Sequence, residues 1–145
     1  MNSDENRIGI KEYLSQALSL NKLIDSYFFE ISRLKELSKK IKTCTFEEHH
    51  GSSGNKEPDF VRCIDSISDY EDKIAKETTK LVQLKQEIEN FICALDSNEE
   101  KLVLRCRYIS GLNWGAIGEY LNMTERNARR IHNRAIRNLE KEISA

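Results

Sequence analysis

Two long stretches of the sequence repeat apolar residues at alternating spacings of three and four. The first lies between about residues 8 and 42, with Ser38 as a polar interruption, and comprises Ile10, Tyr13, Ala17, Leu20, Ile24, Tyr27, Ile31, Leu34 and Ile41. The second is interrupted by Glu77 and comprises Ile67, Tyr70, Ile74, Leu81, Leu84, Ile88, Phe91 and Leu95. This heptad pattern places one apolar seam along each of two coiled-coil helices. The sequence therefore predicts two long helices.

The segment between them, TCTFEEHHGSSGNKEPDF at residues 43–60, collects glycine and serine together with the single proline, Pro58. Both periodicities lapse there, which indicates a connector. Helices of roughly 35 residues would each span roughly 50 Å at 1.5 Å per residue. Because so short a connector cannot cover that distance, the second helix must fold back. We expect an antiparallel helical hairpin as the first domain, residues 1–95.

The first helix also carries apolar residues beside its seam, namely Leu14, Leu23, Phe28 and Leu37. They widen the apolar stripe beyond what one partner helix covers. Packing against the C-terminal part of the chain, or against a second copy, would bury this surface. We predict a homodimer formed through the hairpin.

The composition favours an all-α protein. Six glycines and one proline are too few to break the chain into short strands and turns. No apolar run is long enough to span a membrane, and the N-terminal MNSDENR lacks the apolar stretch of a secretory signal. We expect a cytoplasmic protein whose cysteines, Cys44, Cys63, Cys93 and Cys106, remain thiols.

The sequence offers one candidate zinc site and no recognisable enzyme active site. The set Cys44, His49, His50 and Cys63 has the spacing C-x4-HH-x12-C, which matches no compact zinc motif. No Ser/His/Asp or Cys/His set stands out, and the GSSG of the connector lacks the lysine of a phosphate-binding loop. We expect no metal, no cofactor, no small-molecule substrate and no enzymatic activity.

Residues 96–145 are predicted to form a separate C-terminal module. Ser97 and Glu100 have the spacing of a capping box, in which the Ser97 hydroxyl accepts from the amide of Glu100 and the Glu100 side chain reaches back. The helix that begins there is expected to end at Gly111, which tolerates the left-handed conformation.

A helix-turn-helix is predicted within this module. Asn113 and Thr124 are suited to cap two successive helices, Gly118 permits close helix contact, and Asn122 tolerates the positive φ of a sharp turn. The inward positions would be taken by Ile117, Leu121, Met123, Ala128 and Ile131. The pattern predicts helix, tight turn, helix.

The second of these helices is strongly basic although the whole chain carries a net charge of only −1. At about 100° per residue, one face collects Ala128, Ile131, His132, Ala135 and Leu139 and should be buried. The opposite face and its flanks carry arginine and asparagine side chains. Such a face could be merely solvated, but the excess of arginine over acidic residues favours DNA binding.

Because the N-terminal part of such a helix enters the major groove, we expect Glu125, Arg126, Arg129, Arg130 and Asn133 to face bases. Arg134 and Arg137 lie farther along and are expected to bind phosphate. Trp114 is interpreted as an anchor of the module's core.

Residues 97–141 resemble region four of bacterial sigma factors, most closely in RxIHxRAIxxL from Arg129 to Leu139. The hairpin followed by this module resembles small phage and prophage proteins of Gram-positive bacteria, some of which are thought to activate late transcription. The resemblance implies a bacterial host cell and RNA polymerase as a further partner, and it adds Thr124 and Asn127 to the base-facing residues. Nothing resembles sigma region two.

The function we expect is that of a sequence-specific regulator of transcription that binds double-stranded DNA as a dimer, at a roughly palindromic site. Two alternatives remain open at this point. A DNA-packaging protein similar to small terminase subunits would also join a helix-turn-helix to a helical oligomerisation hairpin. A decoy of sigma region four would bind protein instead of DNA.

Overall fold

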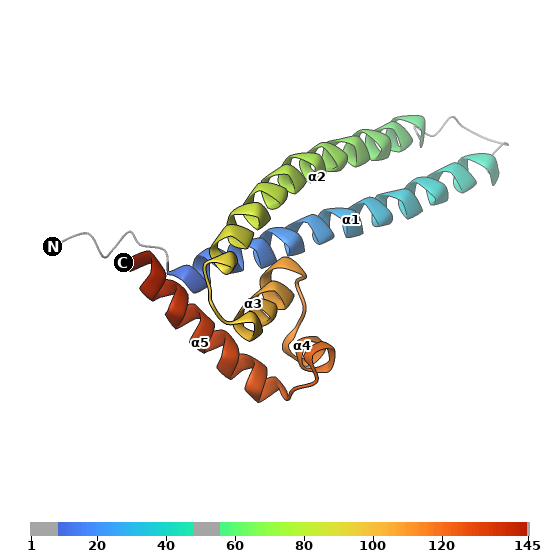
Figure 1. Ribbon diagram of the computed structural model, residues 1–145. Helices are drawn as coiled ribbons and strands as arrows, with labels where there is room; N and C mark the ends of the chain where they lie inside the picture. The colour runs from blue at the N-terminus through green and yellow to red at the C-terminus, as the bar shows by residue number, and fades with distance from the viewer. Residues whose placement is uncertain (1–8, 48–55, 145) are drawn as a thin grey trace. The chain divides into compact units, whose positions relative to one another are not determined.

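The computed structural model describes residues 9–47 and 56–144, and it contains no strand within these ranges. The prediction of an all-α protein is confirmed. The elements in chain order are α1 (Ile10–Glu47), α2 (Lys56–Cys93), α3 (Asn98–Leu104), the π-helix η1 (Arg105–Ile109), α4 (Trp114–Leu121) and α5 (Glu125–Ser144) (Figure 1). None of the described helices is both long enough and apolar enough to cross a membrane.

The chain divides into two compact units. One spans Asn21–Lys80, and the other joins the residues up to Leu20 to those from Leu81 onward. The second unit therefore groups the N-terminal end of α1 and the C-terminal end of α2 with the helix-turn-helix. The domain boundary expected at residue 95 cuts the chain differently and stays a prediction.

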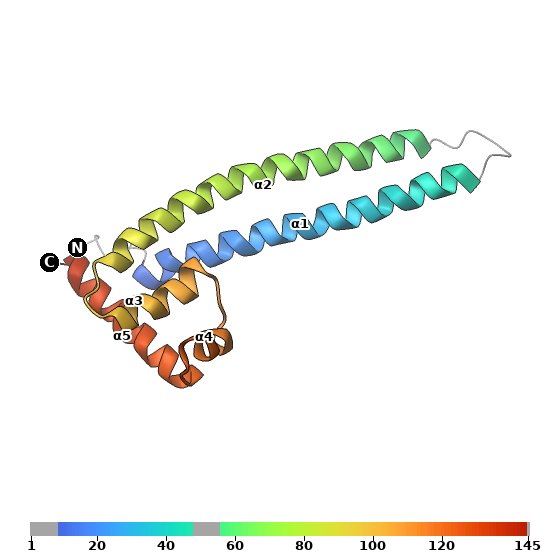
Figure 2. The same ribbon diagram turned by 45° about the vertical axis from the view of Figure 1, so that its right-hand side comes forward.

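In the 21–80 unit, α1 and α2 lie side by side and run in opposite directions (Figure 2). Their contact is the predicted seam, in which Ile24, Ile31 and Ile67 are buried. The rings of Tyr27 and Tyr70 meet across it, with centroids 5.7 Å apart. The antiparallel hairpin is confirmed.

Both long helices extend farther into residues 43–60 than expected. α1 continues to Glu47 and α2 begins at Lys56, while residues 48–55 lie outside the described part of the chain. Apolar periodicity reports burial, and a helix can continue beyond its last buried residue. Pro58 lies in the first turn of α2, where a backbone N–H has no partner within the helix, so its missing donor costs nothing.

In the other unit, the N-terminal end of α1 and the C-terminal end of α2 pack against the C-terminal module. Leu14, Ala17, Ile88 and Ile92 are buried there. The Tyr13 hydroxyl donates to the carboxylate of Glu87. Burial, together with this neighbouring carboxylate, raises the pKa of Tyr13 to about 12. Of the apolar residues expected beside the α1 seam, Leu14 is buried, whereas Leu23, Phe28 and Leu37 remain exposed.

The helix that begins after Ser97 differs from the prediction in two respects. The Ser97 hydroxyl accepts from the Glu100 amide at 3.3 Å, as expected, but the Glu100 side chain does not return to the cap. It turns inward, where arginine and asparagine donors bind it. In addition, the α-helix ends at Leu104 and continues as a π-helix before Gly111, which has the predicted left-handed conformation with φ 69°.

Candidate nucleic-acid interface

The predicted helix-turn-helix is formed by α4 and α5. Asn113 caps α4, because its Oδ1 accepts from the amide of Ala116 at 2.8 Å. Asn122 ends α4 in the left-handed conformation, with φ 55° and ψ 51°. Thr124 then caps α5, since its Oγ1 accepts from the amide of Asn127 at 3.1 Å. Each of these three local roles was predicted, and each is confirmed.

Gly118 sets how closely the two helices approach. A Cβ placed at this position would lie 2.6 Å from the carbonyl oxygen of Met123, which is closer than real Cβ contacts. Met123 is also part of the turn, because its amide donates to the carbonyl oxygen of Gly118 at 2.8 Å. The core beneath is formed by buried Cys106, Ile117 and Ala128, with Leu112, Trp114, Leu121 and Met123 packed against them.

The inner face of α5 is buried as the helical periodicity predicted. Its members, each at most 1% exposed, are Ala128, Ile131, His132, Ala135 and Leu139. Ile136 is also buried, so this face is wider than expected. The outer face exposes Arg126, Arg129, Arg130, Asn133 and Arg137. A helix held so firmly on one side presents the other as a fixed surface.

The residues expected to face bases differ in what already holds them. Arg130 donates through Nε and Nη2 to Oδ1 of Asn127, at 3.2 and 2.8 Å. Arg126 and Arg137 have no side-chain partner within residues 9–47 and 56–144, so their guanidinium groups are free. Glu125 is exposed in the first turn of α5, and Thr124 is occupied as its cap. That these side chains contact DNA stays a prediction.

Arg129 is held by an aromatic ring. Its Cζ lies 5.5 Å from the ring centroid of Trp114, and the Cζ of Arg107 lies 4.8 Å from the same centroid. A guanidinium at this distance from an indole is attracted by the electron density of the ring. Trp114 is partly buried against the core, as predicted, and it also restrains Arg129 near the N-terminal half of α5.

Arg134 has an internal partner. Its Nε donates to Oε1 of Glu100 at 2.8 Å, and Asn138 Nδ2 donates to both oxygens of the same carboxylate at 2.9 and 3.1 Å. Glu100 is only 3% exposed, so this cluster fixes α5 against α3. The expected phosphate contact of Arg134 stays a prediction, and it would have to compete with Glu100.

His132 connects the buried and exposed sides of α5. Its Nε2 lies 2.6 Å from the Tyr108 hydroxyl, and its Nδ1 lies 3.1 Å from Oδ1 of Asn133. Burial lowers the pKa of His132, and the charges of Lys11 and Arg107 lower it further. A neutral ring fits this geometry, because it accepts from Tyr108 and donates to Asn133. The prediction that His132 packs inward is confirmed.

Residues 97–141 match the protein family described as sigma-70, region 4. This module is a sigma region 4-like helix-turn-helix, a DNA-binding structure. The match covers α3, η1, α4 and most of α5, which includes every residue predicted to contact DNA. The comparisons with curated proteins and with solved structures found no match.

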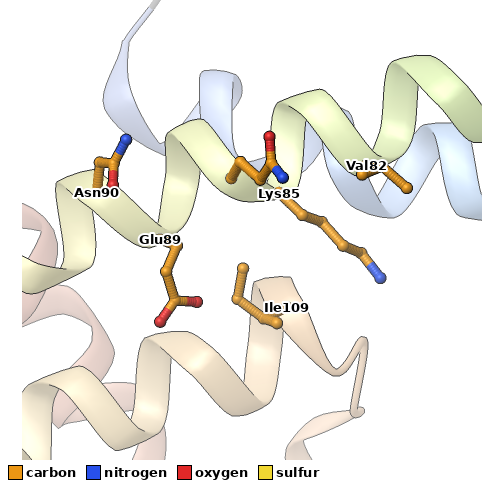
Figure 3. Close-up of a pocket in the computed structure, with 6 residues that line it drawn as sticks. Val82, Lys85, Glu89, Asn90 and Ile109 are labelled. Carbon is orange, nitrogen blue, oxygen red and sulfur yellow. The ribbon is translucent and has the colours of Figure 1, made fainter.

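Beside the sigma region 4-like module, the same unit has a shallow groove of about 550 Å³ between α2 and η1 (Figure 3). It is lined by Val82, Lys85, Gln86, Glu89, Asn90 and Ile109. Glu89 forms an ion pair with Arg105 at its edge. Because its ionisable lining residues are one lysine and one glutamate, the groove has no cationic excess for a nucleic acid, unlike α5.

The predictions also missed two contacts of the module, namely the Glu100 cluster and the contact of Trp114 with Arg129. Neither has a local sequence signal. Glu100 lies 34 residues from Arg134 and 38 from Asn138, and Trp114 lies 15 residues from Arg129. The candidate zinc set lies largely outside the residues whose side chains are described. In the described part of the chain, no cluster of three potential metal ligands is present, and Cys63, Cys93 and Cys106 are free thiols.

Proposed function

We propose that this protein is a sequence-specific regulator of transcription that binds double-stranded DNA as a dimer. The observation that carries the proposal is the outer face of α5. Its cationic and amide side chains project from a helix whose opposite face is fully buried. Similarity to sigma region four supports this reading, because that family binds DNA. The resemblance to phage and prophage proteins leads us to propose a phage or prophage origin and action in the cytoplasm of a bacterial host.

Each part of α5 has a distinct proposed role. The N-terminal half of α5 enters the major groove, where arginine can bind guanine through O6 and N7, and glutamate can accept from cytosine N4. The base-facing residues would be Thr124, Glu125, Arg126, Asn127, Arg129, Arg130 and Asn133. Arg137 would bind phosphate, as would Arg134 if it leaves Glu100. The Asn127 amide, already bound to Arg130, would orient that arginine or read adenine itself.

The proposal includes a dimer because a single module offers few phosphate contacts. The affinity of a DNA-binding protein rises with the number of phosphates that it neutralises. Two copies double that number and require two half-sites related by symmetry. A roughly palindromic target follows.

Selection of bound duplexes from random DNA, with salt held fixed and a nonspecific competitor present, tests the proposal. We expect one enriched motif with two inverted half-sites. Arg126→Ala and Arg130→Ala should weaken binding to it, whereas Arg62→Ala, which removes an exposed arginine of the hairpin, should not. If the α5 variants bind as tightly as wild type and with the same salt dependence, the proposal fails.

The same measurements distinguish the two alternatives. A packaging protein similar to small terminase subunits would form ring-sized oligomers and enrich no short palindrome. A decoy of sigma region four would bind RNA polymerase without binding DNA. We propose RNA polymerase as a second partner of the regulator, which predicts that a ternary complex of protein, polymerase and selected duplex can be isolated.

A further inference from the structure

The C-terminal half of α1 and the N-terminal half of α2 carry opposite charge. Residues 31–43 of α1 contain five basic residues against Glu36, a net charge of +4: Arg33, Lys35, Lys39, Lys40 and Lys42. Residues 58–72 of α2 contain five acidic residues against Arg62, a net charge of −4: Asp59, Asp65, Asp69, Glu71 and Asp72. All ten of these side chains are exposed.

These opposite charges are not paired with each other inside the hairpin. The ion pairs of this stretch each stay within one helix: Arg33 with Glu30 at 3.5 Å, Lys39 with Glu36 at 3.6 Å, and Arg62 with Asp59 at 3.9 Å. Among the described residues of the 21–80 unit, no ion pair joins α1 to α2. Most of the basic and acidic groups are therefore available to another molecule.

Apolar side chains are exposed on the same two helices. Phe28 is 54% exposed and Leu37 48% on α1, while Val61 is 49% exposed and Ile64 47% on α2. Single exposed apolar residues are common on protein surfaces, so it is the charge accompanying them on both helices that indicates an interaction surface. Val61 and Ile64 lie on one face of α2, whereas Phe28 and Leu37, nine residues apart, lie on opposite sides of the α1 seam.

We infer that two copies of the chain pair along residues 21–80, with the basic stretch of α1 in one copy against the acidic stretch of α2 in the other. The inference rests on the dimer of the proposed function and names its surface. Two-fold symmetry forms this contact twice, since each copy supplies one basic and one acidic helix. If α1 paired with α1 of the second copy, two stretches of net charge +4 would face each other and repel. Charge therefore favours pairing of α1 with α2.

Two charge-reversed full-length chains test this arrangement by sedimentation equilibrium without DNA. One carries Lys35→Glu, Lys39→Glu and Lys42→Glu, and the other carries Asp65→Lys, Asp69→Lys and Asp72→Lys. We expect wild type to be dimeric at micromolar concentration and each variant alone to dimerise at least tenfold more weakly. An equimolar mixture should restore the dimer, because every α1 then meets an α2 of opposite charge.

The mixture separates dimerisation from folding. Inside each variant chain, α1 and α2 have like charge whether or not the other variant is present, so a folding defect would persist after mixing. Circular dichroism of each variant alone gives its helix content. A second pair of variants, Phe28→Ser and Ile64→Ser, keeps every charge and should also weaken the dimer.

A monomeric wild type, ring-sized oligomers, or a mixture that stays as weakly associated as its components would each overturn the inference. Binding of the same chains to a single half-site duplex is measured in parallel. A monomer that still prefers one sequence would overturn the proposed surface and the dimer, and would leave sequence-specific DNA binding standing. A charge-dependent dimer without sequence preference would overturn the proposed function and leave the surface standing.

Discussion

Replacing Glu100 with glutamine tests whether the buried carboxylate holds α5 against α3. The carboxylate accepts from Arg134 Nε at 2.8 Å and from Asn138 Nδ2 at 2.9 and 3.1 Å. A glutamine amide has one acceptor oxygen and turns an NH₂ group toward the remaining donor. The variant therefore removes the negative charge from all three hydrogen bonds and loses one of those from Asn138 altogether.

The magnitude follows from the exposure of the partners. A hydrogen bond to a charged group contributes about 1.5–3 kcal/mol. The Arg134 side chain is 39% exposed and can turn to water, so its share is discounted toward the ~0–1 kcal/mol of a surface ion pair. We therefore expect Glu100→Gln to lower the free energy of unfolding by about 2 kcal/mol, most of it from the contact with Asn138.

Urea unfolding followed by the fluorescence of Trp114, the single tryptophan, measures this change within the module itself. Glu99→Gln is the matched control, because Glu99 is exposed and shares the first turn of α3. Both substitutions remove the same favourable interaction with the helix dipole, so their difference isolates the buried cluster. If the two variants agree within about 0.5 kcal/mol, the cluster does not stabilise the module as described.

Three further substitutions probe the helix-turn-helix by the same unfolding assay. Gly118→Ala should cost about 1–3 kcal/mol, because its Cβ would lie 2.6 Å from the Met123 carbonyl oxygen; an unchanged midpoint would contradict that contact. Asn122→Ala should lower the free energy of unfolding by about 1 kcal/mol, because alanine is strained in the left-handed conformation, and Asn122→Gly should leave it nearly unchanged. Equal losses in the two variants would contradict this explanation. Burial lowers the pKa of His132 below 6.5, so the unfolded chain takes up its proton first as the pH falls. Wild type should therefore lose stability as the pH falls below about 6.5, and His132→Gln should lose less over the same range.

The residues of the turn could be predicted because each has a local demand that few residue types meet. A positive φ at Asn122, the close contact at Gly118 and the caps at Asn113 and Thr124 are all set by neighbours in sequence. The buried face of α5 was predictable for a similar reason, since periodicity alone identifies it.

Partners distant in sequence could not be predicted. Glu100 has a plausible local partner in its own helix cap, and nothing local indicates that Arg134 and Asn138 bind it instead. Helical periodicity placed Leu14 and Phe28 alike beside the α1 seam, yet one is buried and the other exposed. That difference depends on which other helices pack against α1, which the pattern within one helix does not contain.

The central claim is that the outer face of α5 reads DNA, and titration of a selected duplex over a range of salt concentrations tests it most directly. The logarithm of the binding constant should fall linearly with the logarithm of the salt concentration, by about 0.9 for each phosphate neutralised. Arg137→Ala should reduce this slope by about one on every sequence, and Arg126→Ala should relax the preference at its own base pair by about 1–3 kcal/mol. Lys22→Ala, at an exposed position of the hairpin outside the charged stretches 31–43 and 58–72, should change neither quantity. If Arg126→Ala and Arg137→Ala keep the wild-type slope and sequence preference, α5 is not the DNA-reading surface.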